Sequence, residues 1–370
     1  MRRVDTCTTC EHHNVRAGLF LAYWPWFSFK EQIELSRLAD ELGLDSVWVS
    51  EAWGQDAASL LGHLSAVTQR VALGSGLFQI PGRSPAMTAM TAATLDVMSG
   101  GRFRLGLGVS GPQVSEGWHG VSFERPVSRT REYVEIVRAA LGREAPLEYE
   151  GREFQLPIPG GMGLGKPLKL LAKPVQDPIP IYLGAVGPKA VEQTAEIADG
   201  WLPFGFNPER ADELLAPFRE AAGSAGCARS VSRASGRDID VAPVVMVCVD
   251  DDRAKARDLA RPWLTVYMGG MGAKGKNFYV EAAERAGFGD SAREVQRLFM
   301  EGDRAGAAAA LSDELIESNA LCTDMAGLPA RIAEFADAGV DTLLAMPFGE
   351  DRPAIVRAIA ACASASWASP

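Results

Sequence analysis

Residues 16–43 read RAGLFLAYWPWFSFKEQIELSRLADELG, and this stretch decides the fold class. An apolar run, 16–22, leads through an aromatic loop into a segment whose apolar residues recur at helical spacing. Ser28 is a favoured residue for the start of that helix and Gly43 for its end. The stretch therefore predicts a β-strand, a loop and an α-helix, which together form the repeating unit of α/β proteins.

The same unit recurs along the whole chain. Eight apolar runs are each followed by a loop and helical sequence: 16–22, 46–50, 71–76, 103–108, 179–183, 200–204, 240–249 and 341–347. A run that is apolar throughout, such as 243–249, is typical of a parallel strand buried on both faces. Crossovers of this length are right-handed almost without exception. We predict a TIM (β/α)8 barrel, with an open doubly wound sheet as the alternative.

Two long segments interrupt the alternation. Residues 143–178 contain a candidate hairpin at 149–154 and a glycine-rich stretch at 159–166, and residues 269–322 begin with glycines and continue mostly as helix. Insertions of this length in a barrel usually lie at the mouth, where ligands bind. We expect residues 1–14 to be a flexible extension and residues 15–370 to form one barrel domain.

Composition restricts the classes of function. Hydrophobic residues make up 47% of the chain and charged residues 23%, which is ordinary for a folded protein. The net charge of −10 gives no general attraction to nucleic acid or to an anionic membrane. No apolar run reaches the roughly 18 residues of a membrane helix, and the N-terminus lacks the apolar core of a signal peptide. We expect a cytoplasmic protein that binds neither membranes nor nucleic acids.

Six cysteines are too sparse for a secreted disulfide scaffold, so we expect reduced thiols. The N-terminal stretch 7–13, CTTCEHH, has the residue types that bind zinc. One short tail would have to supply every ligand, however, so we expect no metal site there.

Candidate site residues follow from the predicted barrel, because active sites of such barrels lie at the C-terminal ends of the strands. Those ends include Tyr23, Glu51, Gly76 and Ser110. Glycines there either let the backbone approach a flat ring or a phosphate, or simply form tight turns. Residues 182–189, YLGAVGPK, contain a Gly-Pro step that starts a helix, which is either an anion site or an ordinary helix start.

Four motifs together resemble a known family. They are 74–77 (GSGL), 99–108 (SGGRFRLGLG), 185–189 (AVGPK) and 195–201 (AEIADGW), in this order. The chain, from about Val15 onward, resembles the bacterial luciferase-like flavin and deazaflavin oxidoreductases. The segments 50–56 (SEAWGQD) and 85–90 (PAMTAM) look most like the branch that depends on coenzyme F420.

The resemblance implies a barrel with insertions, a cofactor at the mouth, and a homodimer. It implies a non-proline cis peptide between Gly76 and Leu77 at the back of the deazaflavin ring. Lys189, with Lys274 and Lys276, could attract the anionic tail of F420. The positions that the resemblance assigns to cofactor binding are Glu51, Gly76, Leu77, Ser110, Gly111, Ala185, Val186, Gly187 and Pro188.

One departure from the family pattern affects the chemistry. The sugar-phosphate dehydrogenases of the family carry His after the acidic residue and Glu after the fourth-strand glycine, where this chain has Ala52 and Pro112. Their acid–base residues are therefore missing. The candidates for proton transfer, besides Glu51, are Tyr23, Glu116, His119 and, with the weakest case, His63.

The expected function is an F420-dependent oxidoreductase that moves a hydride between the deazaflavin and an organic substrate, such as a compound with a C=C or C=N bond. The substrate would be a small molecule or a modified peptide. The alternatives are an FMN-dependent monooxygenase of the same superfamily and, from another class, a non-catalytic flavin-binding protein.

Overall fold

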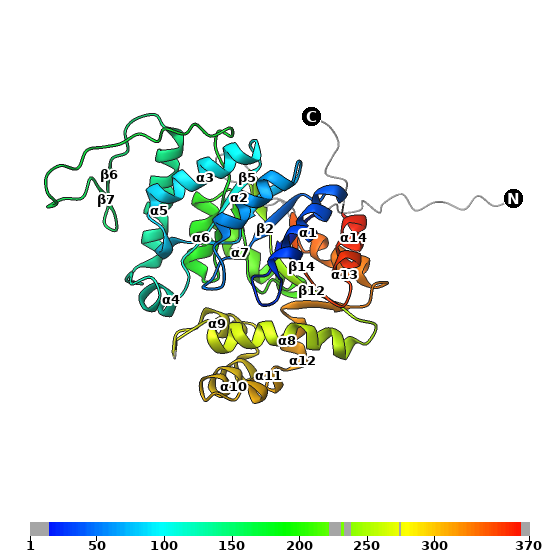
Figure 1. Cartoon of the computed structure of the whole chain (residues 1–370). Helices are drawn as coiled ribbons and strands as arrows, with labels where there is room; N and C mark the ends of the chain where they lie inside the picture. Colours follow the sequence, from blue (N-terminus) through cyan, green and yellow to red (C-terminus); the bar gives the residue numbers. More distant parts are fainter. Residues whose placement is uncertain (1–14, 222–230, 233–237, 274, 364–370) are drawn as a thin grey trace.

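A ring of parallel strands forms the centre of the protein, and helices surround it (Figure 1). The computed structural model describes residues 15–221, 231–232, 238–273 and 275–363. The strands are β1 (Arg16–Leu21), β2 (Ser46–Val49), β3 (Ala72–Ser75), β4 (Phe78–Gln79), β5 (Phe103–Gly108), β6 (Tyr149–Glu150), β7 (Gln155–Leu156), β8 (Ile181–Gly184), β9 (Gly200–Trp201), β10 (Val231–Ser232), β11 (Asp238–Val241), β12 (Val244–Val249), β13 (Ala320–Thr323) and β14 (Thr342–Phe348).

The ring closes through the segment that carries β11 and β12. Parallel pairs connect β14, β1, β2, β3, β5, β8 and β9 in that order. The gap between β9 and β14 is closed because β11 pairs with β9, while β12 pairs with β14. A bridge between Phe204 and Val244 adds to this closure. The predicted TIM barrel is confirmed, and each of its eight expected strands is present.

The helices cover the outside of the ring and extend into a lobe below it (Figure 1). They are α1 (Phe29–Leu42), α2 (Ala57–Val67), α3 (Pro85–Ser99), α4 (Pro112–Gly117), α5 (Pro126–Gly142), α6 (Pro188–Ile197), α7 (Ala211–Ala221), α8 (Arg253–Gly270), α9 (Phe278–Arg285), α10 (Gly289–Met300), α11 (Arg304–Ala309), α12 (Asp313–Glu317), α13 (Leu328–Asp337) and α14 (Arg352–Cys362). Two short 3₁₀ helices, η1 (Ile80–Gly82) and η2 (Pro208–Arg210), complete the set that the structure describes.

The first helices begin and end where side-chain chemistry predicts. The Ser28 side chain accepts a hydrogen bond from the Glu31 amide at 3.2 Å, and Gly43 ends α1 in the left-handed conformation that glycine favours. Asp56 and Ser84 cap α2 and α3 in the same way as Ser28. These caps fix the loops that lead from the ends of β1, β2 and β3.

A buried polar network lies at the N-terminal ends of the strands, opposite the loops that follow β1, β2 and β3. Arg104 donates two hydrogen bonds to the Asp45 carboxylate, at 2.6 and 3.3 Å. Arg16 pairs with Asp240 at 3.0 Å, and the Tyr182 hydroxyl donates to the same aspartate at 2.8 Å. The network joins the starts of strands that are far apart in sequence, and apolar side chains fill the space around it.

The two insertions differ in position. Residues 143–178 form the arm that carries the β6–β7 hairpin, as expected, and the arm projects beside α5 (Figure 1). None of its residues lines the main cavity described below. Residues 269–322 form the lobe and contribute four residues to the cavity: Met271, Phe278, Tyr279 and Asn319. This segment also ends in a strand that was not expected, β13, which pairs with β12.

Membrane-spanning helices and metal clusters are two features for which the described residues give a direct answer. Among these residues, no helix is both long and apolar enough to cross a membrane. The same residues hold no cluster of His, Cys, Asp and Glu that could bind a metal ion. Cys248, Cys322 and Cys362 are free thiols. The expected flexible tail, with its Cys and His residues, lies outside the described residues, as does Lys274.

Candidate functional site

A cavity of about 660 Å³ lies at the C-terminal mouth of the ring. It is lined by the residues that follow β2, β3, β5, β8 and β9, and by side chains from α8 and α9. All the residues that the sequence predicted for cofactor binding contribute to this lining: Glu51, Gly76, Leu77, Ser110, Gly111, Ala185, Val186, Gly187 and Pro188.

Leu77 forms the floor of the cavity and packs against two glycines, Gly108 and Gly184. The peptide bond between Gly76 and Leu77 is cis, as predicted. A Cβ atom at Gly108 or Gly184 would lie 2.7 or 2.3 Å from the Leu77 side chain. With glycine at these two positions, the Leu77 side chain packs directly on β5 and β8. The result is an apolar surface facing the mouth.

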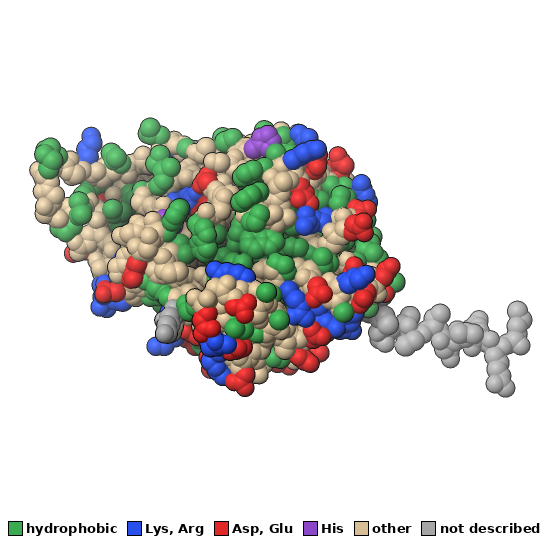
Figure 2. Space-filling view, turned by 60° about the horizontal axis from the view of Figure 1, so that its bottom comes forward, with side chains coloured by type: hydrophobic (Ala, Val, Ile, Leu, Met, Phe, Trp, Pro, Cys, Tyr) green, Lys and Arg blue, Asp and Glu red, His purple; other side chains and the backbone are tan. Residues whose placement is uncertain are grey.

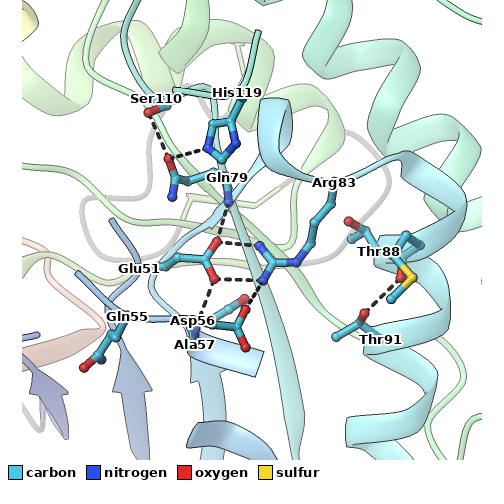
Figure 3. Close-up of polar contacts among 12 residues, drawn as sticks. Glu51, Gln55, Asp56, Ala57, Gln79, Arg83, Thr88, Thr91, Ser110 and His119 are labelled. Carbon is cyan, nitrogen blue, oxygen red and sulfur yellow. Dashed lines mark hydrogen bonds and ion pairs between the residues drawn. The ribbon is translucent and has the colours of Figure 1, made fainter. Parts of the chain in front are cut away.

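Glu51 holds two loops of the mouth together. Its carboxylate accepts hydrogen bonds from the Ala57 amide at 3.0 Å and from the Gln79 amide at 3.2 Å. The guanidinium of Arg83 forms a two-pronged ion pair with the same carboxylate and also bonds Asp56 (Figure 3). The Glu51 side chain is only 4% exposed, so these donors satisfy a nearly buried charge. The partner Arg83 was not foreseen from the sequence.

Gln79 connects this ion pair to the loop after β5. The Ser110 hydroxyl lies 3.3 Å and the His119 Nε2 atom 3.4 Å from the Gln79 side-chain oxygen (Figure 3). Ser110 has a φ of 60°, a left-handed conformation that turns the chain toward α4. The loops after β2, β3 and β5 are therefore one hydrogen-bonded unit.

The loop after β8 provides a helix N-terminus at the cavity. Gly187 is the first residue before α6, and no side chain caps this helix. A Cβ atom at Gly187 would meet nothing within 4 Å, so open space lies in front of its backbone. Lys189 is exposed, and Arg285 donates to the Val186 carbonyl at 3.2 Å. Helix amides with two cations nearby suit an anionic group.

The predicted proton-transfer candidates lie in different places. Tyr23 is 6% exposed behind the cavity wall, and burial raises the pKa of its hydroxyl to about 12. His119 contacts the side chain of Gln79, which lines the cavity, but His119 itself does not line it. Glu116 is exposed and accepts a hydrogen bond from the Phe123 amide, and His63 is exposed on α2. Their catalytic roles stay predictions.

An aromatic wall that sequence reasoning missed forms the side of the cavity opposite Leu77. It consists of Phe204, Trp263, Tyr267 and Tyr279. Trp263 and Tyr267 stack with ring centroids 4.7 Å apart, and Tyr267 stacks on Phe204 at 5.6 Å. Trp263 and Tyr267 are one turn apart on α8, a spacing that places both on one helix face.

The lining suits a flat heterocycle that has an anionic tail. The Leu77 surface and the glycines of β5 and β8 allow close approach of a ring. The buried side-chain oxygen of Gln113, beside Gly111, has no hydrogen-bond partner among the described residues, so a ring N–H could donate to it. The N-terminus of α6 is suited to bind the anionic tail of such a molecule.

The chain is similar to several known proteins. It is 41% identical to a Mycobacterium tuberculosis protein provisionally named as a coenzyme F420-dependent oxidoreductase, over 89% of this chain and 94% of the relative. It is 30% identical to the 5,10-methylenetetrahydromethanopterin reductase of Archaeoglobus fulgidus, over 87% of this chain and 91% of that protein.

Solved structures share the fold. The F420-dependent tetrahydromethanopterin reductase of Methanopyrus kandleri superposes with a TM-score of 0.76 at 24% identity, covering 95% of this chain and 98% of that one. The sequence profile of the luciferase-like monooxygenases matches residues 6–342. With the barrel and its cis peptide on the predicted strand, this match shows that the chain belongs to the luciferase-like monooxygenase family.

Proposed function

We propose that the protein is a coenzyme F420-dependent oxidoreductase that transfers a hydride between the deazaflavin and an organic substrate. The observation that carries the proposal is the cavity itself, which combines the apolar Leu77 surface with an uncapped helix start at Gly187. Several of the similar proteins are named as F420-dependent, which supports F420 as the cofactor.

Each part of the mouth then has a task. Leu77 supports one face of the ring, and the α6 amides with Lys189 bind the phosphate end of the tail. When bound there, the deazaflavin would provide the chemistry of hydride transfer, which these side chains do not supply themselves. The Glu51–Arg83 pair and Gln79 hold the surrounding loops, and the apolar lining excludes water from the reacting atoms.

We propose that the substrate is not a sugar phosphate. Ala52 lines the cavity where the sugar-phosphate dehydrogenases of the family carry histidine, and Pro112 starts α4 where they carry glutamate. Reduction of a C=C or C=N bond in a small molecule is the reaction that we propose. A cytoplasmic location is part of the same proposal.

The cofactor prediction is tested by titrating the purified protein separately with F420, FMN and FAD and following the fluorescence of each. We expect F420 to bind at least about tenfold more tightly than FMN, a difference of about 1.4 kcal/mol. Tight binding of FMN without measurable binding of F420 would contradict the proposal and favour the monooxygenase alternative.

A second prediction concerns Glu51. Glu51→Gln removes the charge that faces Arg83, so we expect the free energy of unfolding to fall by about 1.5–3 kcal/mol while the fold persists. We also expect lower F420-dependent turnover, because Gln79 loses its carboxylate partner. Urea denaturation and steady-state kinetics measure the two effects.

The matched control is Asp56→Asn. Asp56 is the half-exposed partner of Arg83, and asparagine preserves its cap on α2. We expect a smaller loss of stability and of turnover than in Glu51→Gln. Wild-type stability and turnover in Glu51→Gln would show that Glu51 has no role in the site.

A homodimer is the remaining part of the proposal. Met87, Met90, Val97 and Met98 on α3 each leave about half of their surface exposed, and the arm at the left of Figure 2 also carries exposed hydrophobic side chains. Apolar surface of this kind often marks a contact between proteins. Sedimentation velocity distinguishes a dimer from a monomer directly.

A further inference from the structure

The cavity has two sides of different chemistry. β3, β5 and β8 are consecutive in the ring, so Leu77 and the start of α6 lie on one side of the mouth. The aromatic wall (Phe204, Trp263, Tyr267 and Tyr279) belongs to the other side, since α8 follows β12 and Trp263 contacts both Tyr23 after β1 and Phe348 in β14. The wall and the residues of the proposed cofactor site therefore line different sides of the cavity.

This side of the cavity carries no charged side chain among the described residues. Glu51 and Lys189 are the charged residues of the described lining, and both belong to the cofactor side. Met246, Met271 and Met346 complete the aromatic side. A charged group placed here would lose its water without gaining a partner, whereas apolar surface would be well accommodated.

Two hydroxyl groups and the Asn319 side-chain amide are the polar groups of the described lining on the aromatic side. Tyr267 and Tyr279 line the cavity, and Tyr23 packs against Trp263, the ring on which Tyr267 stacks. The Tyr23 hydroxyl is buried without a hydrogen-bond partner among the described residues. The Tyr267 hydroxyl is near enough to affect its ionisation, although the two do not meet hydrogen-bond geometry. Burial raises the pKa of Tyr267 as well, so both hydroxyls are protonated at neutral pH and can donate.

We propose that the aromatic wall is the substrate subsite, and that it selects an uncharged, largely apolar molecule whose carbonyl oxygen accepts a hydrogen bond from Tyr267. This inference rests on the proposed function, because it assigns the substrate class of the same cavity. Phe204, Trp263 and Tyr279 pack against the apolar body of the substrate. Tyr267 donates a hydrogen bond to the carbonyl oxygen and so orients the substrate.

The test measures binding of two matched probes to the full chain by calorimetry, without and with saturating F420. The probes are 2-acetonaphthone, a neutral aromatic ketone, and 2-naphthoate, which presents the same ring system with a negative charge. We expect the ketone to bind at least about tenfold more tightly than the carboxylate. We also expect F420 not to displace it. Equal or tighter binding of the carboxylate, or displacement of the ketone by F420, overturns the proposal.

Tyr267→Phe tests the hydrogen bond while keeping the stacked ring. We expect the affinity for 2-acetonaphthone to fall about five- to tenfold, as expected for the loss of one hydrogen bond, and the affinity for F420 to stay unchanged. Tyr149→Phe is the control, because the Tyr149 hydroxyl bonds Glu135 on the arm side of α5, outside the cavity. Unchanged ketone affinity in Tyr267→Phe overturns the assignment of that hydroxyl.

The same measurements separate this inference from the proposed function. If F420 fails to bind but the ketone binds and depends on Tyr267, the cofactor proposal fails and the substrate subsite stands. If F420 binds and the ketone does not, the cofactor proposal stands and the aromatic wall has another role.

Discussion

Replacement of Asp45 by asparagine is expected to lower the free energy of unfolding by about 3–5 kcal/mol. Asp45 and Arg104 are both largely buried, and their two hydrogen bonds neutralise charges that have little access to water. Asparagine has nearly the same shape but leaves the Arg104 charge without this partner. Removing one member of a buried pair costs far more than removing an exposed one.

Urea denaturation of the wild type and the variant measures the effect. The control is Glu124→Gln, which breaks an ion pair with Arg125 in which the Glu124 side chain is 73% exposed. We expect this control to change stability by less than about 1 kcal/mol. Similar losses in the two variants would contradict a stabilising role for the polar network at the N-terminal end of the barrel.

The same aspartate gives the network a dependence on pH. Burial alone would raise the pKa of Asp45, but the neighbouring Arg104 and Arg16 outweigh it and hold that pKa below its usual value. A carboxylate with a lowered pKa stabilises the folded state above the unfolded pKa of about 3.9. This contribution disappears as the pH falls through the folded pKa. The stability difference between wild type and Asp45→Asn should therefore shrink on acidification below about pH 4.

The strands were predictable because each is a short apolar run before a helical segment. The segment 240–249 is a clear case, although proline at position 243 divides it into β11 and β12, which pair with different neighbours. β13 was missed because Ala320–Thr323 directly follows a helical stretch, without the loop and helix that separate the predicted strands. The pattern of such a run does not by itself distinguish a strand from the end of a helix.

The cofactor side of the cavity was predictable for a topological reason, since every residue assigned to it ends or follows a predicted strand. Partners that are distant in sequence were not predictable. Arg83 reaches Glu51 across 32 residues, and no local pattern indicates such a pair. Tyr267 lies on α8, just before the 269–322 insertion, and Tyr279 lies on α9 within it; an aromatic residue on such helices is ordinarily part of the core. The spacing of Trp263 and Tyr267 on α8 was the sequence signal that could have indicated the aromatic wall. It places both residues on one face of the helix, but it does not show what that face contacts.

Gly187→Val is expected to weaken F420 binding by at least about tenfold, equivalent to about 1.4 kcal/mol. Gly187 has ordinary extended backbone angles, so valine can adopt its conformation. Its added Cβ meets nothing within 4 Å, so the protein itself tolerates the side chain. The branched side chain occupies the space in front of the first turn of α6, whose first N–H belongs to Lys189 because Pro188 has none. It would therefore keep an anionic group from the helix start and its dipole.

This variant separates binding from folding, because stability should stay at the wild-type level while affinity falls. Gly142→Val is the control, since Gly142 ends α5, also has open space at its Cβ, and lies outside the cavity. Fluorescence titration with F420 gives the affinities, and thermal unfolding shows whether each variant is folded. An unchanged affinity in Gly187→Val would mean that the phosphate end of the cofactor lies elsewhere. The charges of Lys189 and Arg285 would then have no part in binding it, because Lys189 lines the cavity at this helix start and Arg285 bonds the Val186 carbonyl beside it.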